Sequence, residues 1–381
     1  MIYLDHAAST PLAPEALRAM LPWLSERWGN ASSIHALGRA ARAAIDDARD
    51  RIAAALRADH DEIHFTSGGT EANNLAVLGA LGAAPASRRR LVISAIEHHS
   101  VLDAARAAER RGYTVSIASA DSEGFVSPES VGALMDADVA LVSVMHANNE
   151  IGAIQNVPAM ARIARAHGAL FHTDAVQTFG ALPVLAHSMG CDLITISAHK
   201  VYGPQGAGAL FVRRGVGIEP RLFGGGQERQ RRPGTENVAA IVGFGVAAAL
   251  AERRREEETA RLVALRDRFV ARMLAGSARA RLNGPARGRL PNNVNLSIDG
   301  VAGATAVVLL DRQGICASAG SACSAGSIDP SHVLVAMGLP PERAAGGIRL
   351  TLGRSTTWEE LEEAAGAIES VAARVRASSA H

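Results

Sequence analysis

The sequence predicts an α/β protein with a large domain, in which helices flank a mostly parallel sheet, and a smaller α+β domain. The first observation is length, because 381 residues exceed what one small core organises. The second is that apolar strand-like runs alternate with helical patterns as far as residue 255. The third is that strand and helix signals mix without this alternation beyond it. We therefore expect residues 14–255 to form the large domain, and residues 1–13 and 256–381 to form the small one.

Composition argues against several classes of partner. The net charge of +1 gives no electrostatic basis for binding nucleic acid or an anionic membrane. No apolar run approaches the roughly 20 residues of a membrane span, and the N-terminus lacks the pattern of a secretory signal. The three cysteines, Cys191, Cys316 and Cys323, are too few and too scattered for a disulfide framework. We expect a cytoplasmic protein with reduced thiols, in which Cys191 and Cys316 belong to the core.

Periodicity assigns the elements in order. Helical patterns predict helices at 36–57, 157–167 and 238–258. They also predict one helix that begins at Leu75 and another that follows Ser100 and ends at about Arg111. Apolar runs predict strands of the large domain at 62–66, 91–96, 113–118, 139–144, 169–172, 192–196 and 207–212. In the small domain, strand signals occur at 292–298, 307–310 and 347–352. Strands that alternate with helices indicate a mostly parallel sheet covered on both faces.

A glycine-rich turn follows the strand expected at 62–66. It contains Gly69 and Thr70 and leads into a helix. Glycines let the backbone approach an anion, a hydroxyl adds a hydrogen bond, and the helix N-terminus supplies free N–H groups. This layout is typical of a phosphate cradle. A plain N-capped helix after a tight turn has the same pattern, so the segment alone leaves both interpretations open.

Lys200 lies just beyond the buried strand expected at 192–196. Lysine is rarely buried without a partner or a function. Removal from water favours the neutral amine, which can attack a carbonyl and form a Schiff base. A strand-end lysine that extends its charged end to solvent is an equally simple interpretation.

Polar residues follow several of the predicted parallel strands. In open α/β sheets, ligands bind outside the carboxyl ends of the strands, where the sequence places Gly69, Thr70, His98, Asn149, Asp174, Gln177 and Lys200. A lysine, a phosphate cradle and an acidic partner for a ring nitrogen are what pyridoxal 5′-phosphate (PLP) requires. Asp174 is the candidate partner of that nitrogen. The alternative is that Asp174 only caps a following helix.

A segment of low complexity contains the third cysteine. Residues 317–327 consist of Ala, Ser, Gly and Cys323 alone. Such a composition buries little apolar surface, so we expect a mobile loop. A thiol on an exposed loop can act as a nucleophile that moves between sites. The alternative is a small residue at a tight packing crossing.

Nine motifs occur in one order along the chain and together resemble a known family. They are Asp-His-Ala-Ala-Ser-Thr-Pro (5–11), Gly-Gly-Thr-Glu-Ala-Asn (68–73), Glu-His (97–98), Asn-Asn-Glu-Ile-Gly (148–152), His-Thr-Asp-Ala-Val-Gln (172–177), Ser-Ala-His-Lys-Val-Tyr-Gly-Pro (197–204), Arg-Pro-Gly-Thr (232–235), Ser-Ala-Cys (321–323) and Ile-Arg-Leu (348–350). The chain resembles the cysteine desulfurases of the NifS/IscS type, which are PLP enzymes of the class V aminotransferase fold, fold type I. The segment around Cys323 resembles the group with an extended catalytic-cysteine loop.

The resemblance implies a role for each matching residue. Lys200 would hold PLP and move the α-proton of L-cysteine, and His98 would stack on the ring and act as an acid or base. Cys323 would attack the substrate sulfur as a thiolate and keep it as a persulfide. The other implied cofactor residues are Asp174 at the ring nitrogen, Gln177 at the ring oxygen, and Gly69, Thr70, Ser197, His199 and Thr235 at the phosphate, Thr235 coming from the second subunit of a homodimer. Asn149 and Arg349 would bind the substrate carboxylate, since an arginine fork binds carboxylate in a bidentate manner.

The resemblance also implies a sulfur acceptor, either an iron–sulfur scaffold or a sulfur-carrier protein such as those of tRNA thiolation. Relatives use their C-terminal tail to dock the scaffold, and the tail after Arg349 is short here. His6 stands where relatives often have an aromatic residue, and Ala319 stands where a second serine is common. Neither change removes a group that the chemistry needs.

Other functions remain open at this point. A selenocysteine lyase or a class V aminotransferase would share the fold, and an aminotransferase would not need Cys323. A metal protein could use histidines with a carboxylate, namely His98, His99, His172, His199 and Asp174, although their spacing matches no structural zinc pattern. A non-enzymatic sulfur carrier or scaffold would usually have several clustered cysteines.

Overall fold

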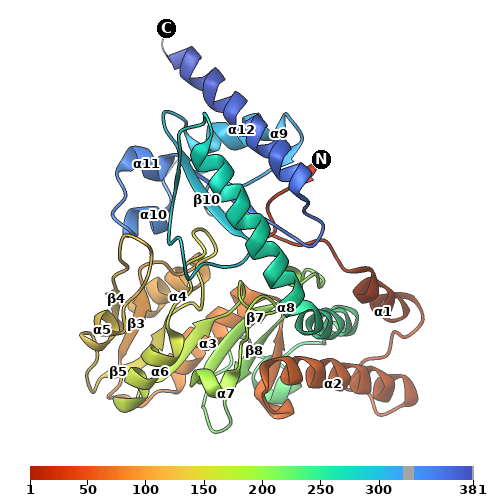
Figure 1. Cartoon of the computed structure of the whole chain (residues 1–381). Coiled ribbons are helices and arrows are strands. Elements are labelled where there is room, and N and C mark those ends of the chain that lie inside the picture. Colours follow the sequence, from red (N-terminus) through yellow and green to blue (C-terminus); the bar gives the residue numbers. More distant parts are fainter. Residues whose placement is uncertain (321–329, 380–381) are drawn as a thin grey trace.

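The computed structural model describes residues 1–320 and 330–379, and its centre is a seven-stranded sheet (Figure 1). The strand order is β2 (Ile63–Thr66), β8 (Gly208–Val212), β7 (Leu193–Ser197), β6 (Leu170–Asp174), β5 (Val139–Ser143), β3 (Arg90–Ser94) and β4 (Thr114–Ala118). All neighbouring pairs are parallel except those that β8 makes with β2 and β7. The predicted α/β architecture with a mostly parallel sheet is confirmed.

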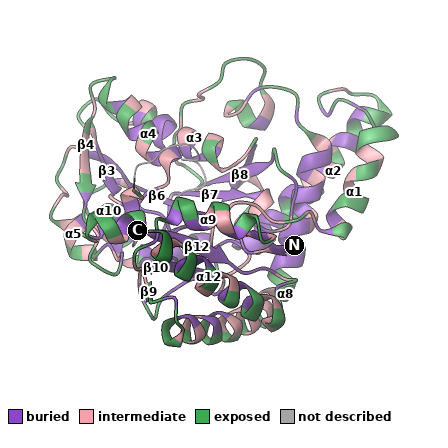
Figure 2. Cartoon of the chain, turned by 90° about the horizontal axis from the view of Figure 1, so that it is seen from above, coloured by how far each residue is buried: buried purple, intermediate pink, exposed green. Residues whose placement is uncertain are grey.

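The sheet is buried on both faces because successive side chains of each strand enter different hydrophobic clusters. Leu193 packs with α3 (Gly69–Ala83) and α4 (His99–Glu109) on one face. Its neighbour Ile194 packs on the other face, which is covered by α2 (Ala36–Leu56), α6 (Val157–Ala166) and the first half of α8 (Val238–Ala275). Figure 2 shows the strands coloured as buried between α3 and α4 on one side and α8 on the other. This two-sided burial explains why the strands appear in the sequence as continuous apolar runs.

Shorter elements lie between these. The helices are α1 (Pro14–Ser25), α5 (Pro128–Gly132) and α7 (Ala186–Met189), and the 3-10 turns are η1 (His60–Glu62), η2 (Ala198–Lys200) and η3 (Gln227–Gln230). The predicted helix at 238–258 is correct but too short, because α8 continues to Ala275. Its charged stretch stays helical with ion pairs three residues apart, such as Arg255–Glu252 and Arg261–Glu258.

The C-terminal part has its own hydrophobic cluster and lies above the central sheet in Figure 1. A three-stranded antiparallel sheet has the order β12 (Gly347–Thr351), β10 (Asn293–Ile298) and β9 (Ala280–Leu282), and β1 (Ile2–Tyr3) pairs with β11 (Ile315–Cys316). The helices there are α9 (Gly303–Asp311), α10 (His332–Ala336), α11 (Pro341–Ala345) and α12 (Trp358–Ser379). Helix α8 contributes to both clusters, with Ala247 in the first and Phe269 in the second.

One predicted strand is wrong, because residues 307–310 belong to helix α9. A short apolar run does not distinguish a strand from a buried helix. Here Gly303, Ala306 and Leu310 are buried at helical spacing, whereas Val308 is exposed. A Cβ on Gly303 would lie 2.2 Å from the carbonyl oxygen of Gly347, so glycine lets the helix start directly against β12. Tertiary packing therefore decides the conformation of this run.

The division at residue 255 stays a prediction, since α8 passes through that position without a break. Cys191 is buried, as expected of a core residue, and burial raises the pKa of its thiol. Cys316 is only partly buried. Across residues 1–320 and 330–379, none of the helices combines the length and apolar character that crossing a bilayer requires.

Candidate active site

The polar residues predicted at the strand ends line one cavity of about 250 Å³. It lies where the parallel strands of the central sheet end, the position at which ligands bind in open α/β sheets. Ala7 and Ala8 of the N-terminal segment and Arg349 of β12 complete its wall. The predicted residues that line it are Gly69, Thr70, His98, Asn149, Asp174, Gln177, Ser197, His199, Lys200 and Arg349.

Lys200 ends η2, directly after the fully buried strand β7. Its Nζ donates hydrogen bonds to the carbonyl oxygens of Ala7 and Ala8, each at 2.6 Å. Gln177 Nε2 donates to the same Ala7 carbonyl at 3.0 Å. The amine is therefore held at the cavity wall by backbone acceptors, and the interpretation of a lysine extended into solvent is not supported.

Asp174 is the last residue of β6, and its carboxylate is hydrogen-bonded on both oxygens. Oδ1 accepts from the N–H of Val176 at 2.9 Å, and Oδ2 accepts from Asn73 Nδ2 at 2.7 Å. The chain turns after Asp174 without starting a helix, so the capping alternative is excluded. Two N–H donors therefore hold the 6% exposed carboxyl group in place at the cavity wall.

Donors for an anion gather around the start of α3. Gly69 leaves space between the start of α3 and Val176, because a Cβ at this position would lie 3.0 Å from Val176 Cγ2. Ser197 Oγ is buried without a hydrogen-bond partner among the described residues. Burial lowers the pKa of His199 to about 4, with a smaller contribution from the charge of Lys200, so its neutral ring can supply an N–H. With Thr70 and the helix N-terminus, these groups suit a phosphate.

His98 is the N-cap of α4 and directly follows the buried acid Glu97. Its Nδ1 accepts from the N–H of Ser100 at 3.1 Å and lies 2.8 Å from Ser100 Oγ. Glu97 is fully buried, and its Oε1 accepts from Ser94 Oγ at 2.5 Å and from the N–H of Met145 at 2.8 Å. Burial raises the pKa of the Glu97 carboxyl to about 8. Glu97 is therefore mostly protonated at neutral pH.

Arg349 lies in the middle of β12 and is 1% exposed. Its Nη2 donates to Asp5 Oδ1 at 2.8 Å, and its Nη1 donates to the carbonyl of Asn149 at 3.2 Å. Its Nε is buried without a hydrogen-bond partner among the described residues. A buried guanidinium that lines a cavity with an unsatisfied N–H suits a carboxylate ligand.

Comparison with known proteins agrees with this geometry. The family model described as aminotransferase class-V matches residues 2–363. The chain belongs to the class-V aminotransferase family.

Among curated members of this family, a cysteine desulfurase IscS from Dictyoglomus turgidum is 46% identical over 375 residues, which cover 98% of this chain and 95% of the relative. A cysteine desulfurase IscS from Methanosarcina thermophila is 42% identical, covering 98% and 93%. Among solved structures, a NifS-like protein aligns with a TM-score of 0.91 at 34% identity over 97% of this chain and 98% of that one. The resemblance to the NifS/IscS type is thus confirmed.

Class-V aminotransferases are PLP proteins, and the residues present fit that cofactor. Lys200 offers an amine at the end of a strand, and Asp174 offers a carboxylate for a ring nitrogen. The orphaned hydroxyl of Ser197, the N-terminus of α3 and neutral His199 offer donors for a phosphate. The three groups that PLP needs therefore line the same cavity.

Two of the expected class-V residues are not placed in the cavity. Thr235 is exposed and does not line the cavity of its own chain. Cys323 and most of the segment 317–327 lie outside the described residues. The backbone before Thr235 is held by a buried ion pair, since Glu228 Oε1 lies 2.7 Å from Arg49 Nη2. Glu228, Arg229 and Gln230 all have positive φ angles.

Sequence reasoning missed residues that complete the cavity of this class-V protein. Asn73 and Ser100 belong to quoted or adjacent motifs, yet no role was predicted for them. Ala7 and Ala8 act through backbone carbonyls, for which the side chain gives no signal. Asp5 belongs to the first quoted motif, two residues before the small residues 7–9. Its role could have been predicted only if the pairing of this segment with Arg349 were known.

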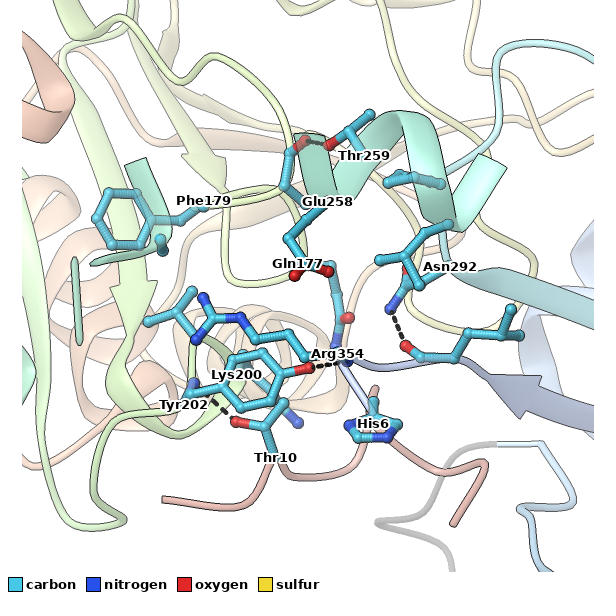
Figure 3. A pocket seen from close by; sticks show the side chains of 17 residues that line it. His6, Thr10, Gln177, Phe179, Lys200, Tyr202, Glu258, Thr259, Asn292 and Arg354 are labelled. Carbon is cyan, nitrogen blue, oxygen red and sulfur yellow. Dashed lines mark hydrogen bonds between the residues drawn. The ribbon is translucent and has the colours of Figure 1, made fainter. Parts of the chain in front are cut away.

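A smaller cavity of about 70 Å³ adjoins the first and shares Lys200 and Gln177 with it (Figure 3). The Arg354 guanidinium lies 4.0 Å from the centre of the Tyr202 ring, and the Tyr202 hydroxyl accepts from the N–H of Arg354. His6 packs edge-on against Tyr3 with ring centroids 4.9 Å apart. Burial lowers the pKa of His6 to about 4, so a neutral imidazole fills the place of an aromatic ring.

The metal-site alternative is not favoured by the class-V geometry. His172 is fully buried, and its two ring nitrogens lie 2.8 Å from Ser143 Oγ and 3.0 Å from Thr195 Oγ1. Burial lowers its pKa to about 3. Within residues 1–320 and 330–379, no three His, Cys, Asp or Glu side chains are grouped as metal ligands.

Proposed function

We propose that this chain is a PLP-dependent cysteine desulfurase, which converts L-cysteine to L-alanine and transfers the sulfur atom as a persulfide on Cys323. The observation that carries the proposal is that one cavity is lined by Lys200, Asp174 and Arg349. These residues supply an amine, a carboxylate for a ring nitrogen and a receptor for an amino-acid carboxylate. The two IscS relatives, named cysteine desulfurases, support the choice of substrate.

The residues of the cavity divide the chemistry among them. Bound PLP supplies an electron sink that makes the α-proton of an amino acid acidic. Arg349 binds the substrate carboxylate through guanidinium N–H groups that donate to no described residue, the Nε–H among them, and Asn149 lies beside it. The Nζ of Lys200 moves the α-proton. Asp174 would hold a proton on the pyridine nitrogen, and the amide of Gln177 would donate to the ring oxygen.

The sulfur step requires a thiol nucleophile, and the proposed one, Cys323, lies outside the described residues. The thiolate of Cys323 attacks the sulfur of the substrate, so an S–S bond forms as the C–S bond breaks. The electron pair of the C–S bond stays with the carbon, which takes up protons and leaves as alanine. A sulfur acceptor then takes the terminal sulfur from Cys323. We infer an iron–sulfur scaffold or a sulfur-carrier protein in this role, in the cytoplasm.

A homodimer completes the phosphate site in this proposal. Thr235 is exposed on its own chain, consistent with a hydroxyl that reaches the phosphate of the second subunit. The Arg49–Glu228 ion pair and the Arg232–Glu71 pair, at 2.9 Å, hold the segment that presents it. The small domain, proposed as residues 1–13 and 256–381, carries Arg349 and Cys323.

The proposal is tested by sulfide and alanine release from L-cysteine with a reductant. Wild type and Cys323→Ala should both be yellow after incubation with PLP, and neither Cys323→Ala nor Lys200→Ala should release sulfide. Cys191→Ala is the matched control, since its buried thiol should be dispensable. A Cys323→Ala protein with full turnover would refute the role of this thiol. A wild type that releases no sulfide from L-cysteine but transfers its amino group would indicate the aminotransferase alternative. A protein that takes up no PLP would refute the proposal.

A further inference from the structure

Four side chains form a hydrogen-bonded chain from His98 to Asp174. Asn73 Nδ2 lies 2.7 Å from Asp174 Oδ2 and 2.8 Å from Ser100 Oγ. Ser100 Oγ in turn lies 2.8 Å from His98 Nδ1. All four side chains line the 250 Å³ cavity. Asn73, Ser100 and Asp174 are only 1%, 6% and 6% exposed, so water competes little for these bonds.

The chemistry of the donors fixes the direction of this chain. A carboxylate only accepts hydrogen bonds, so the amide group of Asn73 that faces Asp174 is its NH₂. The second hydrogen of that NH₂ points to Ser100 Oγ, which leaves the hydroxyl hydrogen of Ser100 for His98 Nδ1. The backbone N–H of Ser100 also donates to Nδ1, at 3.1 Å. Nδ1 therefore carries no proton, and Nε2 of the neutral ring carries it.

We propose that Asn73 and Ser100 are positioning residues that hold His98 as its neutral Nε2–H tautomer and tie it to the Asp174 carboxylate. The proposal rests on the proposed function in one respect, namely that PLP would bind in the cavity that His98 and Asp174 both line. In this arrangement His98 presents an N–H to the cavity. It can take up a proton only at Nδ1, which requires both bonds from Ser100 to break.

The arrangement gives different roles to the two candidate bases, His98 and Lys200. His98 orients PLP and its ligands as a hydrogen-bond donor, and the α-proton is left to the amine of Lys200. Since Asn73 donates to both Asp174 and Ser100, a shift of Asp174 would alter the hydrogen bonds of His98, and a shift of His98 would alter those of Asp174. Asn73 Oδ1 has no hydrogen-bond partner among the described residues, which is the cost of using both amide hydrogens for this bridge.

The tautomer is observed directly by ¹⁵N–¹H correlation spectra of histidine-labelled holoenzyme at neutral pH. The His98→Gln variant identifies the His98 signals by their disappearance. We expect a protonated Nε2 and a bare Nδ1. A proton on Nδ1, or on both nitrogens, would overturn the proposal, and because this measurement uses the wild type it does not depend on the folding of a variant.

A double-mutant cycle on PLP affinity tests the connection. Ser100→Ala and Asn73→Ala should each weaken PLP binding about fivefold, the effect of one hydrogen bond. Because both residues belong to one chain, the double variant should resemble the single variants. A loss near 25-fold, the product of two independent effects, would overturn the connection. Ser143→Ala is the matched control, because it removes an equivalent hydroxyl–imidazole bond outside the cavity and should leave PLP affinity within about twofold.

Neither readout needs turnover, so failure of the proposed function is distinguishable from failure of this proposal. If L-cysteine yields no sulfide, the tautomer and the cycle still decide the roles of Asn73 and Ser100. If PLP does not bind, the proposed function fails, and the tautomer of His98 in the cofactor-free protein decides the proposal.

Discussion

Replacing Arg349 with lysine should weaken the binding of L-cysteine without weakening the binding of PLP. The guanidinium uses one N–H of Nη2 for Asp5 at 2.8 Å and one N–H of Nη1 for the Asn149 carbonyl at 3.2 Å. Three of its five N–H groups, including the buried Nε–H, are left for a ligand. A lysine keeps the positive charge but has one nitrogen. Asp5 would hold that nitrogen, so the donor that points to the substrate carboxylate is lost.

The magnitude follows from one charge-assisted hydrogen bond. Such a bond contributes about 1.5–3 kcal/mol, which corresponds to a factor of roughly 10 to 150 in a binding constant. The pair with Asp5 survives the substitution, so the 1% exposed site gains no unpaired charge and the fold should hold. We therefore expect kcat/KM for L-cysteine to fall by about 10- to 150-fold, mainly through KM.

The assay is sulfide release as a function of L-cysteine concentration, with PLP affinity measured separately by absorbance. Arg343→Lys is the matched control. Arg343 also donates two hydrogen bonds, to Asn283 Oδ1 at 3.0 Å and to the Leu282 carbonyl at 2.8 Å, but it does not line the cavity. Its KM should match that of the wild type. An Arg349→Lys enzyme whose KM stays within twofold of the wild-type value would refute the assignment of the carboxylate site.

Three further predictions concern stability. Glu228→Gln leaves the charge of Arg49 buried and unpaired, because the side chains of Arg49 and Glu228 are only 3% and 1% exposed, and it should lower the urea-derived free energy of unfolding by about 3–5 kcal/mol. Asp103→Asn in the exposed pair with Arg106 should change that free energy by under about 0.5 kcal/mol, and a larger loss there would contradict the reasoning. Gly245→Ala places a Cβ 2.7 Å from the Ala48 Cα and should destabilise the fold by about 1–3 kcal/mol. Gly366→Ala in α12 meets open space and should stabilise the fold by about 0.5–1 kcal/mol. Equal effects of the two substitutions on the thermal midpoint would count against the packing argument. Because burial raises the folded-state pKa of Glu97 from 4.5 to about 8, the folded protein holds a proton that the unfolded chain has released, and stability falls as pH rises between these values. Glu97→Gln should lack this dependence, so its unfolding free energy relative to wild type should rise across that pH range, and a constant difference would argue against a buried neutral acid.

The strand ends show how far local sequence information reaches. Each apolar run of the central sheet ends one or two residues from a polar side chain, so the order of strands and the rule for parallel sheets were enough to bring Gly69, Asp174 and Lys200 together. The strand that ends at Asp174 is longer than predicted because Asp174 itself pairs with Thr195 in β7. Boundaries shift in this way when a ladder bond extends a strand beyond its apolar residues.

Residues 307–310 show where local information ends. Val-Val-Leu-Leu suits a strand, but this run lies in helix α9, which starts against β12 at Gly303 and buries Ala306 and Leu310. In the same way, no local pattern could reveal that Asn73 turns both amide hydrogens toward Asp174 and Ser100, since the three residues come from different elements. Side-chain bridges between elements depend on the tertiary structure, whereas strand-end positions depend on the order of elements.

The N-terminal segment explains why the cavity needs both parts of the chain. Lys200 is fixed by the central sheet, and Arg349 is fixed by the small antiparallel sheet with a separate hydrophobic cluster. Asp5 binds the guanidinium of Arg349, and two residues later the carbonyls of Ala7 and Ala8 bind the amine of Lys200. Four consecutive residues thus set the separation between the group that would move a proton and the group that would hold the substrate carboxylate. For an amino-acid substrate, this separation must match the distance between its α-carbon and its carboxylate. An N-terminal segment without regular structure therefore helps to set the dimensions of the site.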